Sequence, residues 1–281
     1  MALESNVMEL ISPAAAAIPG TVSATLSRLS TWRGEDADGA FDERIDALAG
    51  SVDPDAAARV TVERIDMGNP AACYWSVSGE SLGRSIRARL VLPSGQGAHP
   101  LILMFHDAGR PVRGWHHMTR FAGVGMAVLA LDQEEGPFED VLLDAIALKA
   151  ATRAVSVLDP SSISTWGEGL GGALALGVAA LSGGDIARCA AANPCAPALC
   201  GDCGSLVHLA RRIVCPTLVG TGLMDAPDKV EDQFALVNRM GCPCRHIIYP
   251  KHGRERINAF EDRALAYLLS TAACSVCSLV L

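Results

Sequence analysis

The pattern of hydrophobic and polar positions becomes regular after about residue 72. Leu101–Phe105 and Met126–Leu131 are continuous apolar runs, which are typical of strands covered on both faces. Ser85–Leu92 alternates between polar and apolar positions instead, as a half-buried strand does, and turn residues follow it. Four further strands are predicted at Ile163–Trp166, Ala187–Asn193, Pro216–Gly220 and His246–Tyr249.

Helical spacing of apolar residues fills most of the segments between these strands. The predicted helices are Trp115–Ala122, Phe138–Leu158, Leu170–Leu181, Val230–Met240 and Ile257–Leu269. Strands that alternate with helices of this length indicate an α/β fold, with a mostly parallel sheet and helices on both faces. In such sheets the functional loops follow the carboxyl ends of strands. The candidate loops therefore follow Phe105, Trp166, Gly220 and Tyr249.

Residues 1–70 show no comparable alternation. Ala14–Ala17 and the acidic stretch Gly34–Asp46 suggest peripheral helices. We therefore expect an irregular and helical N-terminal extension over residues 1–70, packed on an α/β domain that spans residues 71–281.

Composition narrows the classes of partner. The chain has 23 Lys and Arg against 31 Asp and Glu, a net charge of −8, and no long basic run. This balance argues against nucleic acid and anionic membranes as partners. The first basic residue is Arg28, so residues 11–20 do not resemble a signal peptide, and a cytoplasmic location is expected. Ala264–Leu281 carries no charge, but its serines and cysteines favour a core-packed helix and a tail over a membrane span.

The 10 cysteines allow two interpretations. Close pairs of thiolates suit a tetrahedral metal such as zinc. The pairs are Cys200 with Cys203, Cys242 with Cys244, and Cys274 with Cys277. They lie at the edges of predicted elements and lack a compact two-knuckle spacing. We therefore interpret them as reduced, mostly buried thiols, and expect no metal.

A glycine-rich turn, Gly167–Gly172, follows one predicted strand and opens a helix. Gly167, Gly169 and Gly172 match the spacing of a dinucleotide-binding fingerprint. That fingerprint belongs in the first strand–helix unit, whereas this turn comes after several strands, so no nucleotide cofactor is expected. The other interpretation is a nucleophile turn of the pattern G-x-S-x-G, with Gly169 where the serine would stand.

The remaining loops favour the nucleophile turn. His106–Gly109 occupies the place of an oxyanion loop, and Asp225 the place of a triad acid. Tyr249–Glu255 occupies the place of a histidine loop. The chain order of turn, acid and histidine loop is that of α/β-hydrolases.

From about Ala72 to Leu269 the chain resembles the acetyl xylan esterase/cephalosporin-C deacetylase family of α/β-hydrolases. The segments that carry the resemblance are Arg87–Pro93, Phe105-His106, Gly125–Asp132, Gly167–Gly172, Asn193–Cys195, Ala210–Asp225 and Tyr249-Pro250 with Glu255. The resemblance implies an α/β-hydrolase fold and carboxylic-ester hydrolysis of small acetylated substrates, such as acetylated carbohydrates. It also implies a homo-oligomer, or association with an active paralogue.

The chain departs from the family at two of the three catalytic positions. Gly169 stands at the nucleophile position and Arg254 at the histidine position, while Asp225 keeps the position of the triad acid. Arg254 cannot act as a base, because a guanidinium stays protonated at physiological pH. The backbone N–H groups of Leu170 and Ala108 are still placed as oxyanion donors. We predict a degenerate esterase, a pseudoenzyme with a binding or assembly role.

The alternative is a weak carboxylic-ester hydrolase in which His252 and Asp225 activate a water molecule. Five smaller expectations concern the side chains around the site. Arg254 pairs with Asp225, the Asp107 carboxylate lies near the oxyanion position, and His106 holds the shape of its loop. His116 and His117 start a helix at the surface, and Glu168 has a structural role.

Overall fold

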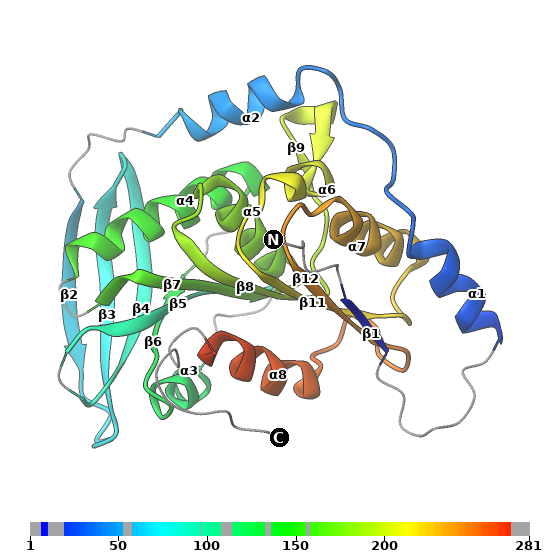
Figure 1. Cartoon of the computed structure of the whole chain (residues 1–281). Helices are drawn as coiled ribbons and strands as arrows, with labels where there is room; N and C mark the ends of the chain where they lie inside the picture. The colour runs from blue at the N-terminus through cyan, green and yellow to red at the C-terminus, as the bar shows by residue number, and fades with distance from the viewer. Residues whose placement is uncertain are drawn as a thin grey trace.

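The computed structural model describes residues 7–10, 20–52, 58–95, 97–107, 114–132, 136–155 and 158–270. Within these residues, ten strands form one mixed sheet in the order β1-β12-β11-β8-β7-β5-β6-β4-β3-β2 (Figure 1). The strands from β1 to β6 in this order pair in parallel, and β4, β3 and β2 close the other edge in antiparallel pairs. The carboxyl ends of the parallel strands therefore share one edge, where the candidate loops meet.

The strands of the sheet have the following bounds. They are β1 Val7–Leu10, β2 Arg59–Ile65, β3 Ala72–Ser81, β4 Arg84–Pro93, β5 His99–Phe105, β6 Ala127–Leu131, β7 Leu158–Glu168, β8 Ile186–Ala192, β11 Thr217–Gly222 and β12 Cys244–Tyr249. Two short strands, β9 (Ala198–Leu199) and β10 (Gly204–Ser205), form a separate antiparallel pair.

Helices cover both faces of the sheet (Figure 1). The helices are α1 Gly20–Leu29, α2 Phe41–Ala49, α3 Trp115–Ala122, α4 Phe138–Ala151, α5 Leu170–Leu181, α6 Leu206–Leu209, α7 Pro227–Arg239 and α8 Asn258–Leu269. One apolar core lies between the sheet and the side that carries α4 and α5, and a second lies between the sheet and the side that carries α3 and α8. Both faces are therefore buried, which explains why β5 and β6 are apolar without alternation.

Helix α5 is buried nearly all round because it lies between β7 and α4. Its residues from Gly171 to Ala180 are all buried. Gly177 lets α4 approach, since a Cβ at this position would lie 2.7 Å from Leu142 Cδ1. A helix that is apolar all round is typical of such a central position. This packing fixes the N-terminus of α5, and so the glycine turn before it.

The α/β class and the mostly parallel sheet are confirmed. Helix α4 was predicted to end at Leu158, but it ends seven residues earlier, at Ala151. Leu158 is instead the first residue of β7. The apolar spacing continues across that boundary, so periodicity alone cannot separate a buried helix from a buried strand.

The expectation of an irregular and helical segment over residues 1–70 is wrong in omitting two strands, β1 and β2. Strand β1 lies beside β12, where Glu9 accepts hydrogen bonds from Arg245 at 2.8 Å and from Arg263 at 2.7 Å. These hydrogen bonds, from Arg263 first, lower the pKa of Glu9. The expected helix around Ala14–Ala17 and the tail after Ser270 lie outside the described residues. No helix in the described ranges is long and apolar enough to cross a membrane.

Candidate active site

The turn between β7 and α5 places a single residue with positive φ at the carboxyl edge of the sheet. Gly169 has φ 54° and ψ −118°, a conformation that side chains rarely adopt. Its N–H donates to Ala192 O at 2.9 Å, and its carbonyl accepts from Ala173 N and Cys195 N. The turn is therefore held on both sides by backbone hydrogen bonds, whatever side chain residue 169 carries.

Two neighbouring glycines allow the turn to be this tight. A Cβ at Gly167 would lie 2.1 Å from Gly171 O, and a Cβ at Gly171 would lie 2.4 Å from Phe105 O. Both contacts are with backbone, which cannot give way cheaply. The first brings the strand close to the start of α5, and the second brings α5 close to the end of β5.

The carboxylate of Asp107 occupies the space in front of this turn. Asp107 follows β5 and is 4% exposed. Its Oδ1 accepts a hydrogen bond from Leu170 N at 2.9 Å, and a Cβ at Gly169 would lie only 2.1 Å from the same oxygen. The Asp107 carboxylate therefore occupies the N–H of Leu170, which the sequence predicted as an oxyanion donor. The other predicted donor, Ala108, lies outside the described residues.

Arg254 neutralises this carboxylate. Its Nη2 lies 3.1 Å from Asp107 Oδ1 and 3.4 Å from Oδ2. The charge of Asp107, followed by this hydrogen bond, raises the pKa of the Arg254 guanidinium. The predicted Asp225–Arg254 ion pair is therefore wrong. Arg254 pairs with Asp107 because this carboxylate is nearly buried, so its charge is stabilised by protein donors rather than by water.

Asp225 and His252 do not form the catalytic pair that the water-based alternative needs. The Oδ1 of Asp225 accepts from Ala226 N at 2.8 Å, immediately before α7. The Nδ1 of His252 lies 2.8 Å from Glu255 Oε1, and the side chain is 41% exposed. The two loops do lie against each other, because Met224 N donates to His252 O at 2.8 Å. The backbone brings the loops together while the two side chains bind other partners.

Asn193 holds this edge together, a role that the sequence analysis did not assign. It follows β8 with φ 43°, in the left-handed region that Asn tolerates better than most residues. Its Oδ1 accepts from Gly222 N at 2.8 Å, and its Nδ2 donates to Gly253 O at 3.0 Å. One buried amide therefore links the loops after β8, β11 and β12. An Asn-Pro pair directly after an apolar strand was the available signal.

The chain resembles known esterases over most of its length. The acetyl xylan esterase (AXE1) family model matches residues 21–137. The structure is similar to that of acetyl xylan esterase 1 from Thermoanaerobacterium sp., with a TM-score of 0.76 and 18% identity over 87% of this chain and 98% of that chain. It is also similar to the acetyl xylan esterase from Paenibacillus sp., with a TM-score of 0.75 and 18% identity over 87% and 99%. No curated protein sequence matches the chain.

The resemblance to the acetyl xylan esterase family is confirmed.

The α/β-hydrolase fold is likewise shown. Brefeldin A esterase, described as a bacterial homologue of human hormone-sensitive lipase, has a TM-score of 0.57 and 16% identity over 91% of this chain and 93% of its own. The acetyl xylan esterase match includes Asp107 and ends before the Gly169 turn. The second half of the site therefore rests on the fold and on the geometry described above.

A buried polar cluster lies beside the turn between β7 and α5. Glu168 is 8% exposed, and its Oε2 lies 3.9 Å from Arg256 Nε. Arg256 also lies 3.3 Å from Glu261, which in turn approaches His117. The expected surface position of His117 is wrong, since its ring is buried against Trp166 and Phe121. The ion pair with Arg256 agrees with a structural role for Glu168.

Burial disfavours the thiolate form of the two thiols Cys195 and Cys215. The pKa of Cys195 is raised to about 11, first by burial and then by the Asp107 carboxylate. Burial also raises the pKa of Cys215 to about 11. Within the described ranges, no group of three or more His, Cys, Asp or Glu residues could hold a metal ion. Cys274 and Cys277 lie outside those ranges.

Proposed function

We propose that this chain is a catalytically disarmed acetyl xylan esterase homologue, a pseudoenzyme whose remaining role is binding or assembly. One observation carries the proposal. The Asp107 carboxylate accepts the Leu170 N–H and lies where a side chain on residue 169 would begin. The scaffold is that of an esterase, and its reaction centre is filled by the chain itself.

The groups around the turn cannot perform acyl transfer. A covalent acyl intermediate needs a nucleophilic atom, and Gly169 has no side chain. Arg254 stays protonated and cannot accept a proton. Loss of the nucleophile alone removes nearly all of the rate that a triad contributes, because its members act as a unit.

The remaining oxyanion donor is also compromised. An oxyanion hole works because fixed donors face the position where negative charge develops. Here the Leu170 N–H already donates to a carboxylate. A substrate carbonyl would have to displace that carboxylate, and the charge of Asp107 would oppose the developing oxyanion.

The alternative, a weak ester hydrolase that uses His252, Asp225 and water, has less support. A general base needs a partner that orients it toward the reacting water. His252 has such a partner in Glu255, but this pair is exposed and Asp225 does not take part. The pairing would have to rearrange before His252 could act with Asp225.

The proposal extends to partners. A homologue that lacks the catalytic residues still has the outer surface of its fold. We infer that its role lies in assembly with further copies of itself or with an active paralogue, and that any retained ligand is a small acetylated carbohydrate or ester.

Hydrolysis of 4-nitrophenyl acetate by the purified native chain tests the proposal. We expect no turnover above the rate in buffer, because no nucleophile and no aligned base face the turn. The His252→Ala variant and its neighbour control Lys251→Ala are measured beside it, and all three should be equally silent. Turnover by the native chain and by Lys251→Ala that His252→Ala abolishes would establish the water-based hydrolase instead.

A further inference from the structure

A pair of cysteines lies at the tip of the small hairpin that β9 and β10 form. Strand β9 pairs with β10 in antiparallel register, with Leu199 opposite Gly204. Cys200 and Cys203 are the next residues on the two arms of the hairpin. Figure 1 shows β9 beside α6 and the segment that leads into α2. The candidate active site uses neither cysteine, so what this pair does is independent of the proposed function.

The turn at the hairpin tip brings the two cysteines within the range of a disulfide. Gly201–Cys203 forms one turn of 3₁₀ helix, in which hydrogen bonds link residues three positions apart. The Cα atoms at the two ends of such a four-residue turn lie less than about 7 Å apart. A disulfide needs a Cα separation of roughly 4.4–6.8 Å. The spacing of the turn therefore suits a disulfide between Cys200 and Cys203.

Contacts from outside the hairpin hold this backbone in place. Cys200 has φ 56°, in the left-handed region that most side chains avoid. Its N–H donates to the Glu139 carboxylate at the start of α4, and its carbonyl accepts from Arg44 Nη1 at 3.4 Å. The carbonyl of Cys203 accepts from Asp38 N at 2.8 Å. None of these contacts uses a sulfur atom, so they persist whether the two thiols are reduced or joined.

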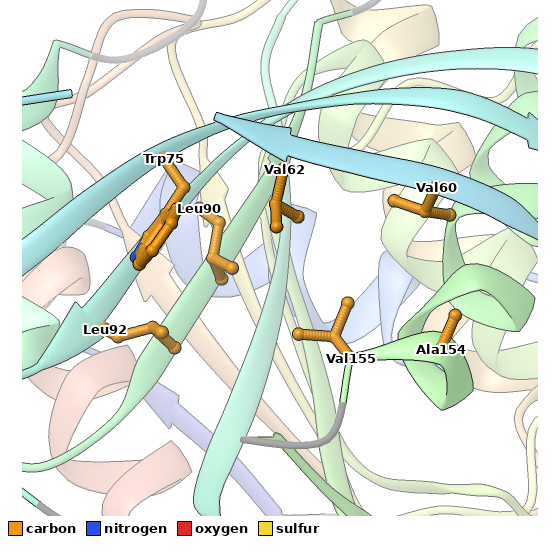
Figure 2. A pocket seen from close by; sticks show the side chains of 7 residues that line it. All are labelled: Val60, Val62, Trp75, Leu90, Leu92, Ala154 and Val155. Carbon is orange, nitrogen blue, oxygen red and sulfur yellow. The ribbon is translucent and has the colours of Figure 1, made fainter. Parts of the chain in front are cut away.

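Both cysteines of the hairpin are accessible to reagents in solution. Every cysteine that the structure describes has a free thiol, and Cys200 and Cys203 are half-buried, whereas the cysteines of β8 and β12 are buried. The hollow at the other end of α4, shown in Figure 2, has no cysteine in its lining. Thiol–disulfide exchange needs an accessible sulfur atom and a second thiol nearby. The hairpin tip provides both, in the Cys-X-X-Cys spacing that is typical of redox-active pairs.

We propose that Cys200 and Cys203 form a reversible exchange site for low-molecular-weight disulfides, such as glutathione disulfide. One cysteine thiolate attacks a sulfur atom of glutathione disulfide, which forms a mixed disulfide and releases one glutathione thiolate. The other cysteine thiolate attacks the protein sulfur of the mixed disulfide, which closes the Cys200–Cys203 bond and releases the second glutathione thiolate. Each released thiolate takes up a proton that a protein thiol gave to water. Two protein thiols are oxidised, and one glutathione disulfide is reduced to two glutathione molecules.

The surroundings of Cys200 influence how fast the exchange runs. Burial raises the pKa of Cys200, followed by the Glu139 carboxylate and the Cys203 thiol, while Arg44 lowers it. Only the thiolate attacks a disulfide, so exchange that starts at Cys200 is slow near neutral pH and accelerates above about pH 8.5. The influence of the Cys203 thiol on Cys200 also agrees with the short distance that the turn imposes.

Equilibration of the native chain in buffers of glutathione and glutathione disulfide tests this proposal. Free thiols are then blocked with N-ethylmaleimide in denaturant, and the tryptic peptide Cys189–Arg211 is sequenced by mass spectrometry. We expect Cys200 and Cys203 to be joined to each other in excess glutathione disulfide. Both should be blocked by N-ethylmaleimide when dithiothreitol has been added first. Circular dichroism should show the same fold in the oxidised and the reduced chain.

Single variants identify the two partners of the bond. Cys200→Ser and Cys203→Ser should each stop at the mixed disulfide, with one glutathione on the remaining cysteine. Cys73→Ser is the control, because Cys73 is also half-buried but lies opposite Leu92, and it should close the bond like the native chain. A folded native chain in which Cys200 and Cys203 both stay open to N-ethylmaleimide in excess glutathione disulfide would overturn the proposal. A bond that forms only when the chain unfolds would overturn it as well.

Discussion

Two parts of the carboxyl edge of the sheet differ in how their loops and side chains are held. At the carboxyl ends of β5 and β7, the backbone retains a tight turn with a residue at positive φ and a helix N–H behind it. At the carboxyl ends of β11 and β12, the backbone brings the acid and histidine loops together, but Asp225 and His252 bind other partners. In both parts backbone hydrogen bonds hold the loops in place, and the side chains of Asp107, Asp225 and His252 each bind a different partner.

Arg254 connects the two parts. It comes from the loop after β12, and its guanidinium reaches across to Asp107 after β5. The ion pair therefore links the loop after β12 to the loop after β5. The backbone hydrogen bonds at this edge do not depend on the side chains of residues 169, 225 and 254, so the framework can be tested separately from the side chains. The predictions below test the framework first and the side chains afterwards.

The largest effect on the free energy of unfolding is expected where α5 packs closely against the end of β5. In Gly171→Ala, the new methyl group would lie 2.4 Å from Phe105 O, so α5 must move away from β5. We expect a loss of about 3 kcal/mol or more in the free energy of unfolding. Urea denaturation measures it, with Gly39→Ala as control, because a Cβ at Gly39 has open space around it. Equal stability of the two variants would show that the turn is not packed as described.

An effect of intermediate size on the free energy of unfolding is expected from Arg254, whose side chain joins the two regions. Arg254→Leu leaves the buried Asp107 carboxylate with the Leu170 N–H but without its guanidinium. We expect a loss of about 1–3 kcal/mol in the free energy of unfolding, since a buried polar group loses one partner. The double variant Asp107→Ala/Arg254→Leu should recover most of it in the same denaturation experiment. An additive loss in the double variant would mean that the two side chains do not interact.

A pH-dependent effect is expected between β11 and β12, and it vanishes above about pH 6.5. Burial lowers the pKa of His246 to about 3, and its Nε2 lies 2.8 Å from Thr221 Oγ1. The folded chain keeps this ring neutral, whereas the unfolded chain binds a proton below about pH 6.5. The free energy of unfolding should therefore fall on acidification from pH 6.5 toward 3, by up to about 1.4 kcal/mol per pH unit from this residue.

The His246→Gln variant should have a shallower acid slope by about that amount. Denaturation between pH 4 and 7 measures it, and the exposed His116→Gln provides the control. If both variants keep the native slope, the ring of His246 is not held neutral by burial.

Much of the fold was predictable because the sheet is buried on both faces. The continuous apolar runs of β5 and β6 and the glycines around α5 determine where strands and helices stand. Strand β2 was not predictable in this way, because as an edge strand it has mostly exposed residues. The end of α4 was missed because its apolar spacing continues toward β7.

The site was predictable in its positions but not in its pairing. Chain order and spacing predicted that Gly169, Asp225 and Arg254 lie in loops after β7, β11 and β12, and the structure has them there, while their roles stay predictions. Which carboxylate Arg254 pairs with depends on burial, and only the structure shows that Asp107 is nearly buried while Asp225 accepts from Ala226. The role of Asn193 likewise follows from a backbone conformation that spacing does not reveal.

The central claim of the proposal is that the backbone framework is that of an esterase. In this claim the nucleophile and the base are absent, and the Asp107 carboxylate fills the space at residue 169. Restoring the serine alone should fail, because the Asp107 carboxylate occupies the space of its Cβ. The direct test is therefore the triple variant Asp107→Gly/Gly169→Ser/Arg254→His, assayed for hydrolysis of 4-nitrophenyl acetate beside the native chain and Gly169→Ser. We predict that the triple variant exceeds both by at least about 100-fold, since a nucleophile and a base act as a unit. A folded triple variant that stays as silent as the native chain would contradict the account, because the framework would then not be that of an esterase.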